Sequence, residues 1–438
     1  MQFFISKIRM SGIKCIDTPI ELEFCNRRIN SSFVVSGNNV KAIYGENGTG
    51  KSAIINAIEI YRNLMIMPDY LSQKSTQEDL LNLIHKKSRQ FQFCVEFIML
   101  DQTGPIKRYS HEICISFNDK TNRYELKKEC LCQYNRYYSS NERILLKAED
   151  GALQRDGLSE SCFENLQKLT MNLLDMQSFM ITILKLNMDQ LNRKSGTIND
   201  LNPDWTDFFG FIAGLSIYTE QSDRHMNNHF KIGDLSKSYE EVLRMDQQFE
   251  LNVEMDRVPK KSLSQYEKQI AETEQFIKLF KPSLKRIDLK KTEDRDSYYI
   301  DKIFVYPEYK ISLEYESTGI KKLVKLYSYL DAVGKGGIVF IDDFDANLND
   351  IYLSRLIEYV LNYCPGQLCF TAHNAGPMDI LQRQSHSLDF ISRDGMIVPW
   401  IKNGNYKARK MYTSGYIQSI PFNVTPESFL GVFGEKGK

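Results

Sequence analysis

The sequence predicts an α/β fold built around a parallel β-sheet, and three observations lead to this prediction. A strand-like run at 41–44 enters a glycine-rich segment at 45–52. Two apolar runs, at 337–341 and 367–371, have the continuous hydrophobicity of strands buried on both faces. A helical pattern at about 352–363 lies between these runs and makes them a βαβ unit.

Composition sets limits on the class of protein. The chain has 438 residues, with 56 Lys and Arg set against 56 Asp and Glu, and 42% of its residues are hydrophobic. These values are ordinary for a globular protein and exclude a disordered chain. The zero net charge gives no general argument for nucleic-acid binding. Nine scattered cysteines without a CxxC pair, and the lack of a long apolar run, favour a cytoplasmic protein with reduced thiols and no membrane association.

The chain divides into three expected segments. Residues 1–132 supply strands at 4–8, 20–24 and 41–44, a helix ending near residue 65, and an antiparallel meander over 91–131, as the first half of a core. Residues 133–297 are expected to form an inserted, compact helical lobe, because no heptad repeat is sustained there. Residues 298–438 supply the second half of the core.

The glycine-rich segment matches the P-loop pattern G-x-x-x-x-G-K-[ST]. Its backbone N–H groups would surround phosphates, Lys51 would reach the β- and γ-phosphates, and the Ser52 hydroxyl would bind Mg²⁺. An accidental glycine turn is the alternative, but the preceding strand and following helix are the context that a P-loop requires. The residues expected to bind ATP here are Gly45, Asn47, Gly48, Thr49, Gly50, Lys51 and Ser52.

Two acids and a histidine follow the later apolar runs. Asp342 and Asp343 end the first run; Asp342 would hold Mg²⁺, and Asp343 would polarise the attacking water. A solvated turn is the alternative. His373 ends the next run, 31 residues after Asp342, where a histidine can contact the γ-phosphate and position water.

A third phosphate-binding element is predicted at Ser317-Thr318-Gly319-Ile320-Lys321. Ser-x-Gly at the start of an apolar helix places a hydroxyl and free N–H groups at a helix N-terminus. A plain serine N-cap also explains this segment when it is taken alone. The order of P-loop, Ser-x-Gly helix, paired acids and strand-end histidine is the more specific signal.

That order resembles the ATP-binding-cassette (ABC) class of ATPases, with its Walker A, signature, Walker B and switch histidine. Over about residues 1–130 and 276–425 the chain is most similar to small AAA-family ATPases with ABC-type heads from bacterial anti-phage systems, including PARIS AriA-like, RloA and abortive-infection types and overcoming-lysogeny-defect-like proteins. The likeness includes Gly12-Ile13-Lys14-Cys15, where Lys14 stands at an ATP-binding position usually held by arginine. It also includes Pro282-Ser283-Leu284-Lys285 and the run from Tyr412 to Pro421.

The resemblance implies a P-loop NTPase of the ABC-ATPase head type, with the meander as an antiparallel side sheet and an inserted helical lobe. It implies ATP and Mg²⁺ as cofactors and a head-to-tail homodimer or higher homo-oligomer. In that dimer Ser317, Gly319 and Lys321 act in trans on the partner's nucleotide. The implied role is a sensor or scaffold that controls a separate effector protein, a nuclease or toxin, on a DNA or phage-protein trigger.

Two departures from the family pattern qualify the expected activity. Asp343 replaces the catalytic glutamate and is one methylene shorter, which predicts slow ATP hydrolysis because a displacement of about 1 Å can cost on the order of 100-fold in rate. Asn349 replaces the histidine that follows the acids.

A different function stays open on the sequence. A RecF- or SMC-like ATPase of genome maintenance that clamps DNA has the same motif order. The basic run at 278–291 is either a solvated face or a contact for nucleic acid. The zero net charge and the shortness of the expected helical lobe count against this alternative.

Overall fold

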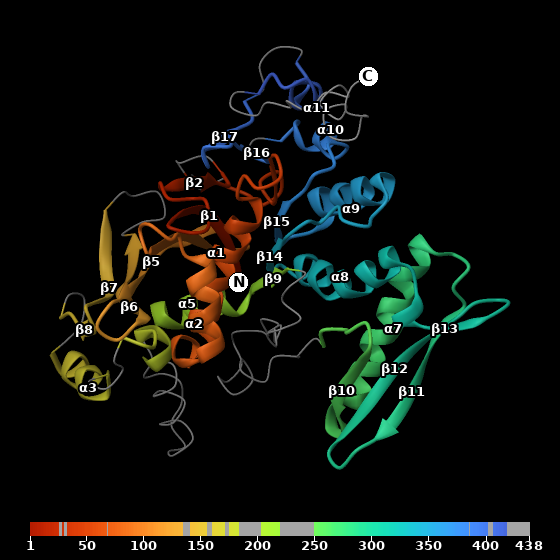
Figure 1. Cartoon of the computed structure of the whole chain (residues 1–438), viewed down its shortest axis with the longest axis horizontal. Coiled ribbons are helices and arrows are strands. Elements are labelled where there is room, and N and C mark those ends of the chain that lie inside the picture. The colour runs from red at the N-terminus through yellow and green to blue at the C-terminus, as the bar shows by residue number, and fades with distance from the viewer. Residues whose placement is uncertain are drawn as a thin grey trace, which may run out of the picture.

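The computed structural model describes residues 1–25, 29, 33–67, 69–134, 141–155, 160–170, 175–183, 203–219, 249–384, 386–401 and 406–417. Its strands form a six-stranded, a seven-stranded and a four-stranded sheet (Figure 1). No helix in these ranges combines the length and hydropathy that a membrane span requires.

The six-stranded sheet is the core of the molecule, in the order β17-β16-β3-β15-β14-β9. Its strands are parallel except for β17 at one edge. The bounds are β3 Val40–Tyr44, β9 Leu215–Tyr218, β14 Ile338–Ile341, β15 Gln367–Thr371, β16 Leu388–Ile391 and β17 Ile397–Pro399. The predicted βαβ unit is confirmed as β14, α9 (Asp350–Tyr363) and β15.

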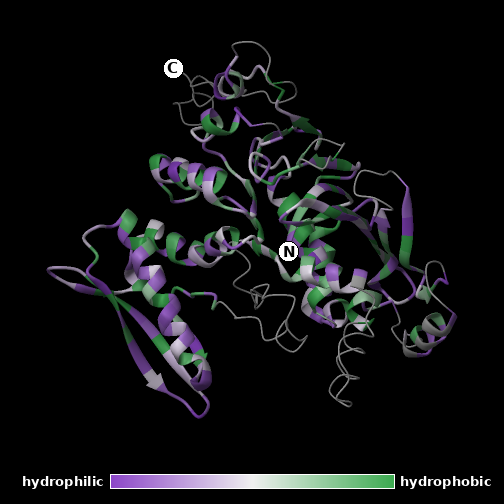
Figure 2. Ribbon diagram, turned by 180° about the vertical axis from the view of Figure 1, so that it is seen from behind, coloured by the Kyte–Doolittle hydropathy of each residue, from purple (hydrophilic) through white to green (hydrophobic). Residues whose placement is uncertain are grey.

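Helices cover both faces of the core sheet, which explains why its strands are apolar throughout. Successive side chains of a strand point to opposite faces. Ile338 and Phe340 of β14 pack with α1 (Lys51–Ile66) on one face. Val339 and Ile341 pack with α8 (Thr318–Gly334), α9, α10 (Met378–Leu381) and α11 (Ala408–Thr413) on the other. Figure 2 shows this concentration of hydrophobic residues in the core strands.

The seven-stranded sheet confirms the predicted antiparallel side sheet, in the order β2-β1-β4-β5-β6-β7-β8. Its bounds are β1 Gln2–Ser11, β2 Ile20–Glu23, β4 Gln90–Asp101, β5 Gly104–Asn118, β6 Arg123–Tyr134, β7 Glu142–Glu149 and β8 Ala152–Leu153. The helical elements beside it are η1 Tyr70–Ser72, α2 Lys74–Leu83, α3 Glu160–Thr170 and α5 Pro203–Ala213. The start of α5 is fixed to β5, because the Tyr109 hydroxyl donates to Asp204 and Asp207 at 2.8 and 2.7 Å.

The four-stranded sheet and α7 (Leu263–Phe280) form a smaller lobe, on the opposite side of the core from β4–β8 (Figure 1). Its strands are β10 Met255–Pro259, β11 Arg286–Glu293, β12 Ser297–Val305 and β13 Lys310–Ser312, with 3₁₀ turns η4 Lys260–Ser262 and η5 Leu313–Tyr315. One apolar cluster joins α7 to this sheet and to the first turns of α8. The lobe therefore supports the helix that begins after Ser317.

The expectation of a compact helical lobe over 133–297 is wrong for the described part of that segment. The segment holds α3, α5 and α7, but also β7, β8, β10 and β11. Leu215–Tyr218 pairs in parallel with β14 and belongs to the core sheet. This buried strand has only four residues and directly follows the apolar helix α5. The hydrophobic period therefore does not change visibly between helix and strand, and the sequence pattern does not show where the strand begins.

A buried ion pair ties the P-loop strand to its neighbour, and its loss is expected to destabilise the fold. Lys41 Nζ of β3 lies 2.6 Å from Asp389 Oδ2 of β16, and both side chains are buried. Burial raises the pKa of Asp389, and the charge of Lys41 opposes this rise. Replacement of Asp389 with alanine leaves Lys41 buried without its carboxylate, and we expect a loss of about 3–5 kcal/mol in unfolding free energy, measured by urea titration.

The double variant Lys41→Met/Asp389→Leu is the control for this prediction. Because it removes both charges from the interior, it is expected to recover most of the lost stability. A single variant within about 1 kcal/mol of the unaltered chain would contradict the role assigned to the pair.

Candidate functional site

The predicted P-loop connects β3 to α1 and has the backbone that the pattern requires. Gly48 and Gly50 have positive φ angles of 81° and 109°. The Lys51 ammonium folds over the loop and donates to the carbonyl oxygens of Gly45 and Glu46 at 2.8 and 2.9 Å. Burial lowers the pKa of Lys51, while the nearby carboxylates oppose this shift. The lysine is thus held at the start of α1, where the N-terminal helix dipole also favours an anion.

Side chains from distant parts of the chain hold this loop in place. The Thr49 hydroxyl donates to the Glu46 carbonyl at 2.9 Å. The Glu46 carboxylate pairs with Arg393 at 2.7 Å. The Gly45 N–H donates to the buried Tyr412 hydroxyl, which places the late Tyr412 element against the loop; residues 418–421 of that element lie outside the described residues.

At Gly50 a side chain would meet both close neighbours and a left-handed backbone. A Cβ there would lie 3.0 Å from Cys15 Sγ and 3.2 Å from Ile16 Cγ1, at a φ of +109°. We expect Gly50→Ala to lower the unfolding free energy by about 1–3 kcal/mol and to weaken ATP binding. Gly48→Ala is the matched control, because its Cβ would meet nothing within 4 Å. Urea titration of both variants checks the prediction, and a Gly48→Ala loss as large as that of Gly50→Ala would contradict the steric part of it.

Asp342 lies at the carboxyl end of β14, next to the P-loop. It forms hydrogen bonds with the Ser52 hydroxyl and with Thr371 Oγ1, the latter at 2.5 Å. Burial raises the pKa of Asp342, and these hydrogen bonds oppose the rise. A carboxylate and a hydroxyl brought together in this way are the hard oxygen donors that Mg²⁺ prefers, so the two residues fit the expected metal. No set of three or more His, Cys, Asp or Glu in the described ranges could hold a metal on its own.

Asp343 and His373 face each other from the ends of neighbouring strands. His373 Nε2 lies 3.5 Å from Asp343 Oδ1, and the hydrogen bond with His373 is the main cause that lowers the pKa of Asp343. Asp343 has a positive φ of 46°. Its N–H donates to Thr371 Oγ1 at 2.8 Å, and Lys322 Nζ donates to its carbonyl at 3.3 Å. Asp343 is therefore ionised and held in a fixed orientation.

Most of these groups line one cavity of about 460 Å³. It is lined by Lys14, Cys15, Asn47, Gly48, Gly50, Lys51, Ser52, Ala53, Asp343 and His373. Three residues predicted to bind ATP or Mg²⁺ on this chain do not line it: Gly45 and Thr49 shape the loop, and Asp342 contacts the lining residue Ser52. Lys14 is exposed, with a positive φ of 45°, in the turn after β1. Two lysines, the Ser52 hydroxyl and an acid–histidine pair line this cavity, and Asp342 is hydrogen-bonded to Ser52; these groups fit the polyphosphate and metal ion that the sequence predicts.

The Ser-x-Gly element lies elsewhere, at the N-terminus of α8. Ser317 is the N-cap, and its hydroxyl accepts from the Ile320 N–H at 3.5 Å. A Cβ on Gly319 would come 2.9 Å from the Asn347 carbonyl, so the helix start packs closely on the loop after the paired acids. Ser317, Gly319 and Lys321 are not among the residues that line the cavity. The predicted Ser-x-Gly element therefore lies outside the chain's own cavity.

The order of the central strands decides the fold class. The histidine-bearing strand β15 lies between the P-loop strand β3 and the acid-bearing strand β14, beside an antiparallel sheet and a helix that begins at Ser-x-Gly. The fold is that of an ABC-type ATPase head. No family model and no curated protein matches the chain.

Solved structures with similar folds include an SMC head bound to the C-winged helix domain of ScpA, with 14% identity, a TM-score of 0.45, and coverage of 91% of this chain and 97% of that one. The SMC head domain from Thermotoga maritima has 15% identity, a TM-score of 0.34, and coverage of 92% and 100%. The recombination mediator RecF with ATP has 11% identity, a TM-score of 0.35, and coverage of 91% and 98%. Similarities this low identify neither an activity nor a partner.

Three residues of the site were missed from the sequence. Thr371 orients both acids, and Asp345 Oδ2 accepts the N–H groups of His373 and Asn374 at 2.8 and 2.5 Å. Cys15 lines the cavity, with its thiol 3.7 Å from the Gly48 carbonyl. Thr371 could have been predicted from the sequence, because it is a polar residue at the carboxyl end of an expected buried strand, next to the strand that carries the acids. Nothing in the sequence pattern indicates Cys15.

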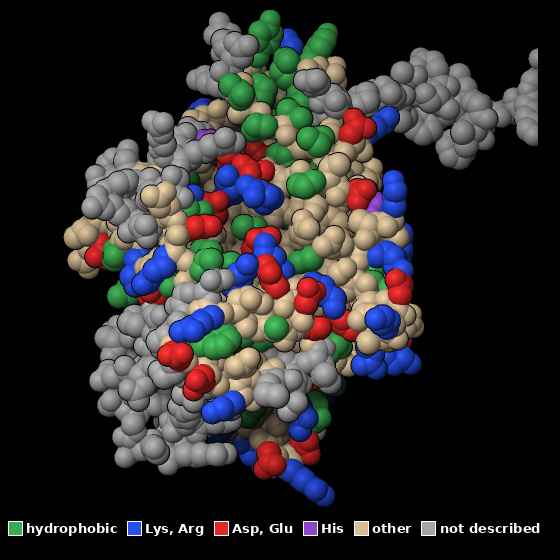
Figure 3. All heavy atoms as spheres, turned by 90° about the vertical axis from the view of Figure 1, so that its left-hand side faces the viewer, with side chains coloured by type: hydrophobic (Ala, Val, Ile, Leu, Met, Phe, Trp, Pro, Cys, Tyr) green, Lys and Arg blue, Asp and Glu red, His purple; other side chains and the backbone are tan. Residues whose placement is uncertain are grey.

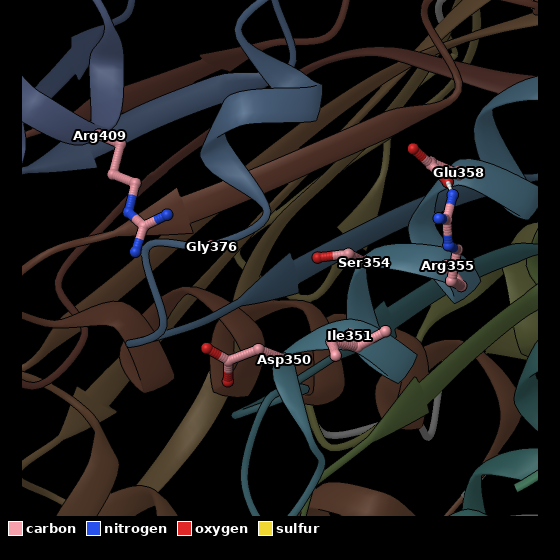
Figure 4. A pocket seen from close by; sticks show the side chains of 7 residues that line it. All are labelled: Asp350, Ile351, Ser354, Arg355, Glu358, Gly376 and Arg409. Atoms are coloured by element: carbon pink, nitrogen blue, oxygen red, sulfur yellow. Dashed lines mark hydrogen bonds and ion pairs between the residues drawn. The ribbon is translucent and has the colours of Figure 1, made fainter.

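A second cavity, of about 330 Å³, lies between the start of α9 and α11 (Figure 4). Its two cations already face carboxylates: Arg355 lies 2.6 Å from Glu358, and Arg409 lies 3.3 Å from Asp379. Because both guanidinium groups are paired, we assign no ligand to this cavity.

Proposed function

We propose that the chain binds ATP with Mg²⁺ at the P-loop cavity and hydrolyses it slowly to ADP and phosphate. The observation that carries this proposal is that residues from three separate strand ends meet at one site: Lys51, Ser52, Asp343 and His373 line one cavity, and Asp342 is hydrogen-bonded to Ser52. A glycine turn without function would not require acids and a histidine from other strands beside it.

Each group has a distinct task in the proposed reaction. The loop amides and Lys51 bind the phosphates, and Ser52 and Asp342 hold the metal, which neutralises phosphate charge when bound. The Asp343 carboxylate accepts a hydrogen bond from the attacking water. His373 orients the Asp343 carboxylate through their contact. His373 also contacts the γ-phosphate in the proposed reaction. The side chain of aspartate reaches less far than that of glutamate, and for this reason we expect a low rate.

We further propose that ATP joins two copies head to tail. Ser317, Gly319 and Lys321 lie outside the chain's own cavity, and the Ser317 end of α8 is an anion-binding N-terminus. In the dimer these residues would complete the partner's site. Loss of the γ-phosphate would then remove contacts between the subunits and change the assembly. Higher homo-oligomers built from such dimers fit the same proposal.

The biological role that we propose follows from the resemblance of the motifs to anti-phage ATPases. The chain would act in the cytoplasm as sensor or scaffold and control a separate effector, a nuclease or toxin, on a DNA or phage-protein trigger.

The second candidate is a RecF- or SMC-like ATPase that clamps DNA. It is favoured by the exposed basic side chains Lys285, Arg286, Lys290 and Lys291 on and before β11. Arg286 and Lys291 are paired with carboxylates at the surface, however, which weakens their attraction for phosphate. Figure 3 shows a different face, that of the antiparallel side sheet away from β11, and there acidic and basic side chains are interspersed rather than segregated.

Steady-state ATP hydrolysis with and without duplex DNA tests both candidates, with Lys51→Ala as the blank. Hydrolysis above the blank supports the ATPase proposal, and a rate equal to the blank contradicts it. Stimulation by DNA that is lost in a Lys285→Glu/Lys290→Glu variant favours the clamp. A rate that DNA leaves unchanged favours a protein trigger.

A further inference from the structure

Beside the Ser-x-Gly element, the structure presents an aromatic ring to solvent. Tyr315 is 71% exposed and ends the 3₁₀ turn η5, two residues before Ser317. The turn is firmly anchored, because Leu313 is fully buried and Ser312 Oγ accepts from the Glu314 N–H at 3.3 Å. A large aromatic ring exposed on an anchored turn is a type of side chain that often contributes to a binding site.

Glu316 joins Tyr315 and Ser317 into one rigid unit. One of its carboxylate oxygens accepts from the Ser317 N–H at 2.9 Å, and the other accepts from the Tyr306 hydroxyl at 2.5 Å. Tyr306 follows β12 and is buried, so this carboxylate connects the segment to the small lobe. The backbone that carries Tyr315 and Ser317 is therefore held in place, and a ligand at the Ser317 hydroxyl lies within reach of the Tyr315 ring.

The P-loop cavity lacks the group that Tyr315 would supply. Its described lining consists of charged and small residues, and its one aromatic ring is the imidazole of His373, which already faces Asp343. This lining suits phosphates and metal, but it has no Phe, Tyr or Trp ring on which a purine base could stack. Stacking on an aromatic ring is worth a factor of about 5 to 150 in affinity for each base.

We infer that Tyr315 stacks on the adenine of the ATP that the partner copy holds, so that each subunit supplies the base platform of the other's site. This inference rests on the proposed head-to-tail dimer, in which Ser317 meets the partner's γ-phosphate. Two residues span at most about 7 Å, and the tyrosine side chain extends this reach along the nucleotide. ATP-driven association then depends on the base as well as on the triphosphate.

Sedimentation velocity with increasing ATP and Mg²⁺ tests the inference on Tyr315→Ala, Tyr315→Phe and Tyr363→Ala. Tyr363 is the matched control: it is 76% exposed, at the end of α9, beside the end of α8 opposite Ser317. We expect Tyr315→Ala to need about tenfold more ATP for half-maximal dimerisation, whereas Tyr315→Phe and Tyr363→Ala match the unaltered chain. Inorganic triphosphate, which has no base, should act equally on all four proteins.

Several results would overturn the inference. One is dimerisation of Tyr315→Ala at the same ATP concentration as the unaltered chain. Another is a Tyr315→Phe defect as large as that of alanine, which would point to the hydroxyl rather than the ring. Weaker ATP binding by dilute, monomeric Tyr315→Ala would place the ring on the chain's own nucleotide. If the unaltered chain does not dimerise with ATP, the head-to-tail proposal itself fails, and that result is distinct from the others.

Discussion

Replacement of Asp343 with asparagine is expected to reduce ATP hydrolysis by about 100- to 10,000-fold, because its ionised carboxylate is the group that we assign to accept a hydrogen bond from the attacking water. Its low pKa, caused mainly by the hydrogen bond with His373, keeps it charged at neutral pH. Asparagine has nearly the same shape and keeps the N–H bond to Thr371. ATP binding should therefore survive, and ATP-bound dimers should persist.

The matching gain-of-function variant is Asp343→Glu. The added methylene moves the carboxylate toward the cavity, and a correction of about 1 Å is worth up to on the order of 100-fold in rate. The positive φ of 46° at this position is less favourable for glutamate than for aspartate, so part of the gain will be offset by lower stability. Single-turnover hydrolysis measures the gain in rate, and urea titration measures the loss of stability. Unchanged hydrolysis in Asp343→Asn would remove Asp343 from the reaction.

Much of the core of this molecule is predictable from the sequence because its signals are local. A P-loop needs a strand, a glycine-rich turn and a helix in direct succession, and all three are found as β3, the loop and α1. The strand ends that carry Asp342 and His373 were also predictable, because a parallel β14–α9–β15 unit places the carboxyl ends of both strands at one edge.

The parts that sequence reasoning missed depend on contacts between distant segments. Leu215–Tyr218 is a strand only because β14 offers it a partner. The strand β11 has exposed, charged residues over most of its length and is stabilised by pairing with β12. Thr371 acquires its role only when β15 lies beside β14, where its hydroxyl reaches both acids. Hydrophobic periodicity reports burial along one segment and says nothing of such partners.

Mixing two inactive variants is expected to restore hydrolysis, and this is the strongest test of action in trans. Lys51→Ala removes the phosphate-binding lysine, and Ser317→Arg places a bulky side chain at the exposed start of α8. Each homodimer then has two defective sites. A mixed dimer joins the intact P-loop of one chain to the intact Ser317 of the other, so an equal mixture should regain about one quarter of the original rate if dimers form at random.

The matched control mixes Lys51→Ala with Asp343→Asn. Both residues line the same cavity of one chain, so every site in every dimer retains a defect and no activity should return. Restoration in the first mixture but not in the second can arise only when Ser317 serves the partner's nucleotide. If neither mixture recovers at concentrations where the unaltered chain dimerises, Ser317 does not act across the interface, and the exposed start of α8 has another role.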